Sequence, residues 1–175
     1  MNSKIIQEIA YLKNNYKNNT NIYEIEYLNL DEKYFLDTLQ KIIKSGNKNV
    51  KIIDDKEYIH NGMILNIDMN GNMICNNRKM LKYKYIDNVK INLYNDRVIN
   101  VDNFPGSNNY NDLYKQKKMI FNINNMDLIL TIKTRKNPNP KPKKEEDKTI
   151  TSYEIRIKMN SSINEKDLEV FTKYL

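Results

Sequence analysis

The stretch Tyr23-Glu24-Ile25-Glu26-Tyr27 alternates apolar and acidic residues at the spacing of a β-strand. In a β-strand, side chains two positions apart lie on the same face. The aromatic and aliphatic residues of this stretch can therefore pack into a core. Glu24 and Glu26 then project together from the opposite face, so we expect one face of a sheet to gather charged groups.

The same alternation returns near the end of the chain, where Glu154, Arg156 and Lys158 share a face. The expected strands between these two segments also place polar residues at alternate positions, on one face of each strand. These residues are Lys82 with Lys84, Lys90 with Asn92, and Thr131 with Lys133 and Arg135. If the sheet closes, one polar set lines a tunnel of mixed charge. Carboxylates there can hold a divalent cation, and Lys and Arg can neutralise phosphate. Any half-exposed antiparallel sheet shows the same alternation, so the alternative is a solvated surface.

Composition limits the classes of protein. At 175 residues the chain suits a single domain, residues 1–175, and its formal net charge of +7 favours polyanionic partners. The abundance of Asn, Ile, Lys and Tyr indicates an AT-rich coding genome, which weakens the charge as evidence. One cysteine and one histidine exclude an internal disulfide and a Cys/His zinc cluster, and an intracellular location follows. No stretch approaches the roughly 20 apolar residues of a membrane-spanning helix, so no membrane partner is expected.

The order of elements predicts an α+β fold that is predominantly antiparallel β, arranged as a barrel or sandwich. Apolar spacing predicts a helix in the first dozen residues and a second that Asp31 caps and that ends near Ser45. Asn70-Gly71 predicts a hairpin turn. Residues 136–149 are charged and Pro-rich, and predict a flexible loop. The other expected elements are strands at Met63–Asp68, Asn72–Asn76, Met80–Ile86, Val89–Leu93, Arg97–Val101, Lys117–Ile123, Asp127–Arg135 and Ile150–Met159, and a last helix capped by Asn164.

Two stretches resemble a known family. Tyr23–Leu28, followed by the segment from Asp31 to Ile43, looks like the opening of the triphosphate tunnel metalloenzymes. The resemblance is to the metal-dependent RNA 5′-triphosphatases of fungi and large DNA viruses, the beta type of mRNA capping enzyme. Those begin with a Glu-x-Glu strand and a helix carrying a Phe and several Leu. The terminal segment Ser152–Lys158 and its helix are similar to the family's closing strand, usually also Glu-x-Glu.

The resemblance implies an eight-stranded antiparallel tunnel in which Glu24, Glu26 and Glu154 bind Mg²⁺ or Mn²⁺ and are catalytic. Its implied activity removes the terminal phosphate of triphosphate-ended RNA, the first step of mRNA capping. A separate guanylyltransferase or polymerase subunit would be a partner, and the host cytoplasm or the virion of a large DNA virus the location. The implied triphosphate-binding residues are Lys82, Lys84, Lys133, Arg135, Arg156 and Lys158.

Two departures from the family pattern keep alternatives open. Arg156 stands where the second closing glutamate is expected, and Leu28 stands where a basic residue usually follows the first pair. A cation at position 156 repels a metal ion directly. One alternative is therefore a non-catalytic relative that binds RNA or a transcription or capping subunit, with Tyr83 and Tyr85 stacking on bases. Another is a tunnel for small triphosphates or polyphosphate.

Overall fold

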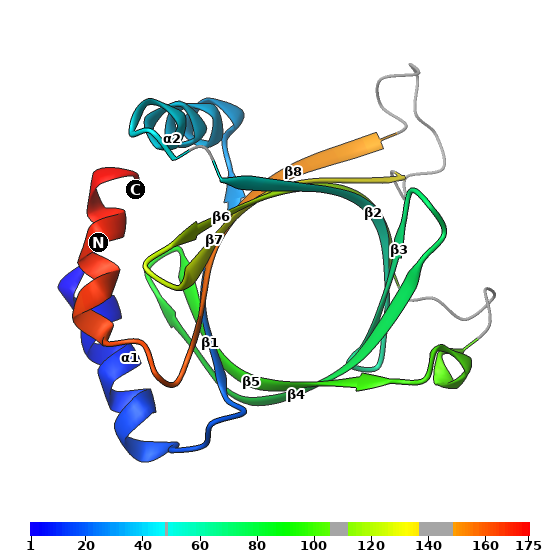
Figure 1. Cartoon of the computed structure of the whole chain (residues 1–175), viewed down its shortest axis with the longest axis horizontal. Coiled ribbons are helices and arrows are strands. Elements are labelled where there is room, and N and C mark those ends of the chain that lie inside the picture. Colours follow the sequence, from blue (N-terminus) through cyan, green and yellow to red (C-terminus); the bar gives the residue numbers. More distant parts are fainter. Residues whose placement is uncertain (48, 106–111, 137–148) are drawn as a thin grey trace.

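The fold is a closed barrel of eight antiparallel strands, seen end-on in the computed structural model (Figure 1). The structure describes residues 1–47, 49–105, 112–136 and 149–175. Around the barrel the strands follow the order β1-β5-β4-β3-β2-β6-β7-β8, and β8 pairs with β1 to close the ring. The strands are β1 (Ile22–Leu30), β2 (Val50–His60), β3 (Met63–Asp68), β4 (Met73–Ile86), β5 (Val89–Ile99), β6 (Asp112–Ile123), β7 (Met126–Lys136) and β8 (Thr149–Asn160).

Helices cover one side of the barrel, where α1, α2 and the C-terminal 3-10 helix η4 lie outside the strands (Figure 1). The elements are α1 (Ser3–Asn15), α2 (Glu32–Lys44) and η4 (Glu165–Lys173), and a short 3-10 helix, η1 (Val101–Asn103), follows β5. The two ends of the chain meet here, because the Met1 ammonium donates a hydrogen bond of 2.6 Å to the Thr172 hydroxyl. No helix in the described ranges has the length and apolarity needed to cross a membrane.

The main core lies between these helices and the outer face of the barrel. Ile25 of β1 and Ile157 of β8 are register partners, and both are fully buried. Phe35 of α2 packs on Tyr153 of β8, with 5.2 Å between ring centres. Apolar residues thus occupy alternate positions that face outward, which leaves the other positions of the same strands for the tunnel.

Several predicted boundaries are corrected. Asp31 does cap α2, since its side chain accepts a hydrogen bond from the Tyr34 amide, and the predicted Asn70-Gly71 turn joins β3 to β4. However, two pairs of predicted short strands are each one long strand, β4 and β5. Arg97 and Asp96 belong to β5, because long strands are needed to span a barrel wall at a tilt. Of the predicted flexible loop, positions 137–148 lie outside the described residues, while Lys136 is the last residue of β7 and Thr149 the first residue of β8.

Candidate functional site: a polar belt inside the tunnel

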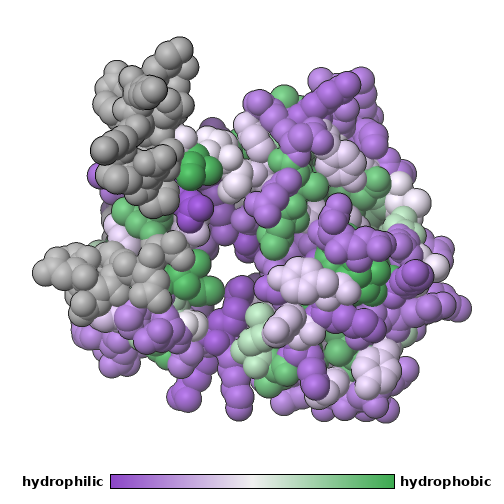
Figure 2. All heavy atoms as spheres, turned by 180° about the vertical axis from the view of Figure 1, so that it is seen from behind, coloured by the Kyte–Doolittle hydropathy of each residue, from purple (hydrophilic) through white to green (hydrophobic). Residues whose placement is uncertain are grey.

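The inner face of the barrel wall carries the candidate site. Glu24 and Glu26 lie on the inner face of β1 and are almost fully buried, at 2% and 7% exposure. Their register partners on β8 are Lys158 and Arg156, and those on β5 are Asn92 and Lys90. Seen from the opposite end, the barrel has an opening through it, with hydrophilic side chains reaching in (Figure 2).

Arg156 lies at the centre of the acidic cluster. Its Nη2 donates a hydrogen bond of 2.6 Å to Glu154 Oε2, and its Nε lies 3.2 Å from Glu26 Oε1. The second contact is an ion pair without hydrogen-bond geometry. Burial alone would lower the pKa of Arg156, but the surrounding carboxylates, Glu24 foremost, raise it above the ordinary arginine value. The guanidinium therefore stays charged and is held among the glutamates.

Glu24 is held by neutral donors from β5. The Tyr94 hydroxyl donates to Glu24 Oε2 at 3.1 Å, and the Asn92 amide donates to both β1 glutamates, at 3.4 Å to Glu24 and 2.6 Å to Glu26. Burial, and then the negative charge of Glu24, raise the pKa of Tyr94 above its usual value, so the hydroxyl remains a donor. Arg78 of β4 stacks on the Tyr94 ring at 4.0 Å, which extends the network by one strand.

Lys133 of β7 continues the network on the other side of Arg156. Its Nζ lies 3.3 Å from Glu154 and 3.3 Å from Glu57 of β2. Glu57 also accepts a hydrogen bond of 3.1 Å from Gln116 of β6, whose amide lies 3.3 Å from Asn66 of β3. Burial raises the pKa of Glu57, but the charge of Lys133 and further cations lower it below its ordinary value. The Glu57 carboxylate is therefore ionised in its buried position.

These contacts form one continuous series of polar side chains around the tunnel, which we call the tunnel belt. Every strand of the barrel contributes at least one member, and each member contacts another from the same or a neighbouring part of the wall. A belt of this kind keeps many charged groups in a fixed arrangement that faces a common space. Its members are Arg78, Tyr94, Asn92, Glu24, Glu26, Arg156, Glu154, Lys133, Glu57, Gln116 and Asn66.

Most residues predicted for the site meet in the tunnel. Glu24, Glu26, Glu154, Lys133 and Arg156 belong to the belt. Their strand mates at alternate positions, Lys158 and Arg135, share the inner face, and Arg135 lines a tunnel pocket of about 240 Å³ together with Lys133 and Glu154.

Lys82 and Lys84 are not brought to this site. Lys82 is the register partner of Leu93 and Lys84 that of Ile91, and both partners are buried in the outer core. Lys84 forms an ion pair with Glu8 of α1, outside the barrel. The physical reason is a β-bulge between Met80 and Lys82, where one extra residue reverses the side to which all later residues of β4 point.

The same bulge decides which other residues of β4 face the tunnel. Before it, Arg78, which sequence reasoning missed, faces the tunnel and pairs with Asp96 at 2.9 Å. After it, Tyr83 and Tyr85 face the tunnel, as partners of Asn92 and Lys90, and are 63% and 60% exposed. Glu57 was also missed, although Asp55 and Glu57 alternate on β2 and therefore share its inner face. This alternation of acidic residues in the sequence is the signal by which Asp55 and Glu57 could have been found.

The fit of the site to a divalent metal ion follows from the partners of its carboxylates. Mg²⁺ and Mn²⁺ require several oxygen ligands and tolerate no fixed cation among them. Here the oxygens of Glu24, Glu26 and Glu154 already face amide, hydroxyl or cationic donors, and Arg156 lies between them. Within the described ranges, no three His, Cys, Asp or Glu residues are grouped to hold a metal. The arrangement therefore does not fit a divalent ion.

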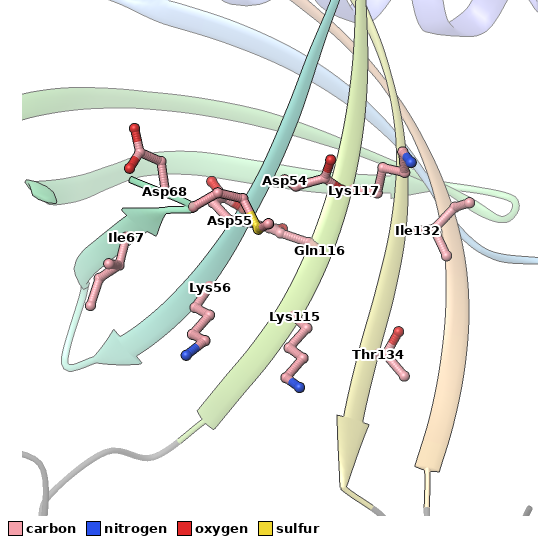
Figure 3. A pocket seen from close by; sticks show the side chains of 11 residues that line it. Asp54, Asp55, Lys56, Ile67, Asp68, Lys115, Gln116, Lys117, Ile132 and Thr134 are labelled. Atoms are coloured by element: carbon pink, nitrogen blue, oxygen red, sulfur yellow. The ribbon is translucent and has the colours of Figure 1, made fainter. Parts of the chain in front are cut away.

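A separate hollow lies outside the tunnel. It has a volume of about 570 Å³ and is lined largely by outer-face residues of β2, β6 and β7 (Figure 3). Lys56 and Lys115 are register partners there, as are Asp54 and Lys117. Asp54 and Lys117 carry opposite charges, whereas Lys56 and Lys115 carry like charges side by side, and the connected tunnel belt remains the stronger candidate site.

Solved structures with the same fold include RNA triphosphatases. The S. pombe RNA triphosphatase Pct1, in complex with the Spt5 CTD, matches with a TM-score of 0.66 and 9% identity, over 97% of this chain and 88% of that one. The triphosphatase of the mimivirus capping enzyme matches with a TM-score of 0.58 and 10% identity, over 99% and 98%. No family model and no curated protein sequence matches the chain. The likeness establishes the triphosphate tunnel fold that the sequence resemblance predicted, in a strongly diverged sequence.

Proposed function

We propose that this protein binds the 5′-triphosphate end of RNA inside its tunnel, as a divergent protein of the RNA triphosphatase type. The observation that supports this proposal is the set of cationic side chains that face the inside of a closed barrel. Arginine and lysine donate charge-assisted hydrogen bonds to phosphate oxygens, and these are about twice as strong as neutral ones. The inward cations come from β4, β5, β6, β7 and β8: Arg78, Lys90, Lys118, Lys133, Arg135, Arg156 and Lys158.

Polyphosphate suits this tunnel because it is slender and carries charge along its whole length. The cations are paired with carboxylates, for example Lys118 with Asp55 at 3.0 Å, so the ligand must displace or share these partners. A triphosphate offers enough negative charge for that exchange, whereas a single phosphate offers less. The tunnel therefore favours a triphosphate end over a monophosphate end.

Two features favour RNA over a small triphosphate. The formal net charge of +7 attracts a long polyanion. Tyr83 and Tyr85 face the tunnel with exposed rings, and exposed aromatic side chains stack on unpaired bases. Inorganic triphosphate and nucleoside triphosphates are the competitors against which this preference is measured.

The test measures binding of one short RNA with three different 5′ ends, triphosphate, monophosphate and hydroxyl, by fluorescence anisotropy. We expect the triphosphate end to bind most tightly. Lys133→Met should weaken it by about ten- to a hundredfold, since one charge-assisted contact is worth roughly 1.5–3 kcal/mol. The matched control is Lys117→Met, which removes an outer-face cation from the neighbouring strand β6. Equal affinity for the three ends contradicts the proposal.

Removal of the terminal phosphate is the second candidate function. It is favoured by the gathering of Glu24, Glu26 and Glu154 around one point of the tunnel, where they could position a reacting water. The assay is phosphate release from γ-labelled triphosphate-ended RNA, with and without Mg²⁺ or Mn²⁺, with Glu24→Ala as the control. Phosphate release by the wild type that is absent in Glu24→Ala supports hydrolysis. Tight binding without release leaves an RNA-binding protein, for which a polymerase or guanylyltransferase subunit is the natural partner.

A further inference from the structure

The charges nearest to Arg156 balance one another. Four carboxylates lie around it: Glu24, Glu26, Glu154 and Glu57. Four cations lie among them: Arg156, Lys133 at 3.3 Å from Glu154, Lys90 at 3.7 Å from Glu26, and Lys158, the register partner of Glu24. A divalent site needs an excess of negative charge, and this cluster has none.

We propose that the Arg156 guanidinium is a built-in cation that takes the place of a divalent ion, so that the tunnel binds triphosphate ends without metal. The inference rests on the proposed function and specifies how that site recognises its ligand. The side chain is 17% exposed and is fixed from two directions by Glu26 and Glu154. A cation attached to the chain carries no binding equilibrium of its own, so its charge is present whatever the metal concentration.

Arginine is chemically suited to this role. A guanidinium has five N–H donors in one plane, more than its contacts with Glu26 and Glu154 use, and this plane matches the oxygens of a phosphate. It also keeps its charge at any physiological pH. Arg156 can therefore hold the glutamates in place and donate to a phosphate from the same position.

The first arm of the test measures Mn²⁺ binding by electron paramagnetic resonance, without RNA. We expect weak binding to the wild type and binding at least about tenfold tighter to Arg156→Glu, which replaces a repelling cation with an oxygen ligand. The matched control is Lys82→Glu, the same charge change on the outer face, which should behave as the wild type. If Arg156→Glu unfolds at a lower temperature than the wild type, Arg156→Gln takes its place, and a smaller increase in Mn²⁺ affinity is expected. Tight Mn²⁺ binding by the wild type, or no gain in a folded variant, overturns the inference.

The second arm measures binding of triphosphate-ended RNA at constant ionic strength. Affinity for the wild type should be the same in EDTA as in Mn²⁺, and Arg156→Gln should weaken the binding measured in EDTA by about tenfold. Binding that appears only with Mn²⁺ overturns the inference and leaves the proposed function standing. Failure to discriminate the triphosphate end under either condition counts against the proposed function, while the metal titration still decides the role of Arg156.

Discussion

On the outer face of β1 and β8, Ile25 and Ile157 are register partners that are fully buried beneath the helices. On the inner face of the same two strands, one position further along, Glu26 and Arg156 are register partners that form an ion pair. Apolar burial stabilises the fold by about 25 cal/mol per Å². A buried ion pair contributes little net stability, since the attraction is offset by lost hydration. The outer face therefore holds the barrel together, and the inner face is available for ligand chemistry.

The largest expected effect tests the outer face. Phe35 of α2 is fully buried against the barrel, so Phe35→Ala should lower the free energy of unfolding by about 3–5 kcal/mol. Urea denaturation followed by circular dichroism gives this value. Discrimination between RNA 5′ ends should persist in the fraction that stays folded. A loss below about 1 kcal/mol would mean that the helices contribute little to the barrel.

A smaller, pH-dependent effect tests the inner face. The pKa of Glu57 is lowered in the folded protein, so its ionised form stabilises the fold above the ordinary value of 4.5, and this contribution is lost as pH falls further. Glu57→Gln should cost about 1–2 kcal/mol at pH 7, because Lys133 keeps Glu154 as a partner.

Urea denaturation of both proteins between pH 7 and pH 3 measures this difference. It should be constant down to about pH 4.5 and then shrink as the wild type gains a proton. A difference that grows on acidification would contradict the lowered pKa of Glu57. Asn66→Ala, which removes a neutral neighbour in the same belt, is the control and should give no such pH dependence.

The smallest expected effect tests which face of the barrel wall the lysines of β4 occupy. Lys84 pairs with Glu8 on the outside of the barrel, with its side chain 54% exposed. Lys84→Ala should therefore change the unfolding free energy by less than about 1 kcal/mol and leave RNA binding unchanged. Lys133→Met, an inner-face change of the same charge, is the comparison. A loss of RNA affinity in Lys84→Ala equal to that in Lys133→Met would place Lys84 in the ligand path.

Much of the fold followed from local patterns. The alternation around Glu24 and Glu26 gave β1 and its two faces, and Asp31 gave the start of α2, because strand parity and helix capping depend on near neighbours in the chain. The closure of the barrel did not follow from such patterns. It depends on the pairing of β1 with β8, which lie at opposite ends of the sequence.

The site was predictable only where strands are regular. Glu154, Arg156 and Lys158 keep their parity through β8, and the structure brings them to the tunnel with Glu24 and Glu26. Parity fails on β4, where the bulge reverses it and Lys82 faces outward. A bulge is set by pairing with the neighbouring strand, so its position is not visible in the residues of β4 themselves.

The bulge at Leu81 also makes the facing of half a strand depend on how β4 pairs with β5. Deleting Leu81 would leave Lys82 opposite Leu93, as it is now, so both faces would keep their residues. A regular ladder that kept Leu81 would instead place Lys82 opposite Asn92 and exchange the two faces from Lys82 to Ile86. The tunnel wall would then change from aromatic to basic without any change in residue type. Evolution can thus alter what such a tunnel attracts by gaining or losing a bulge, a route that substitution statistics at individual positions do not record.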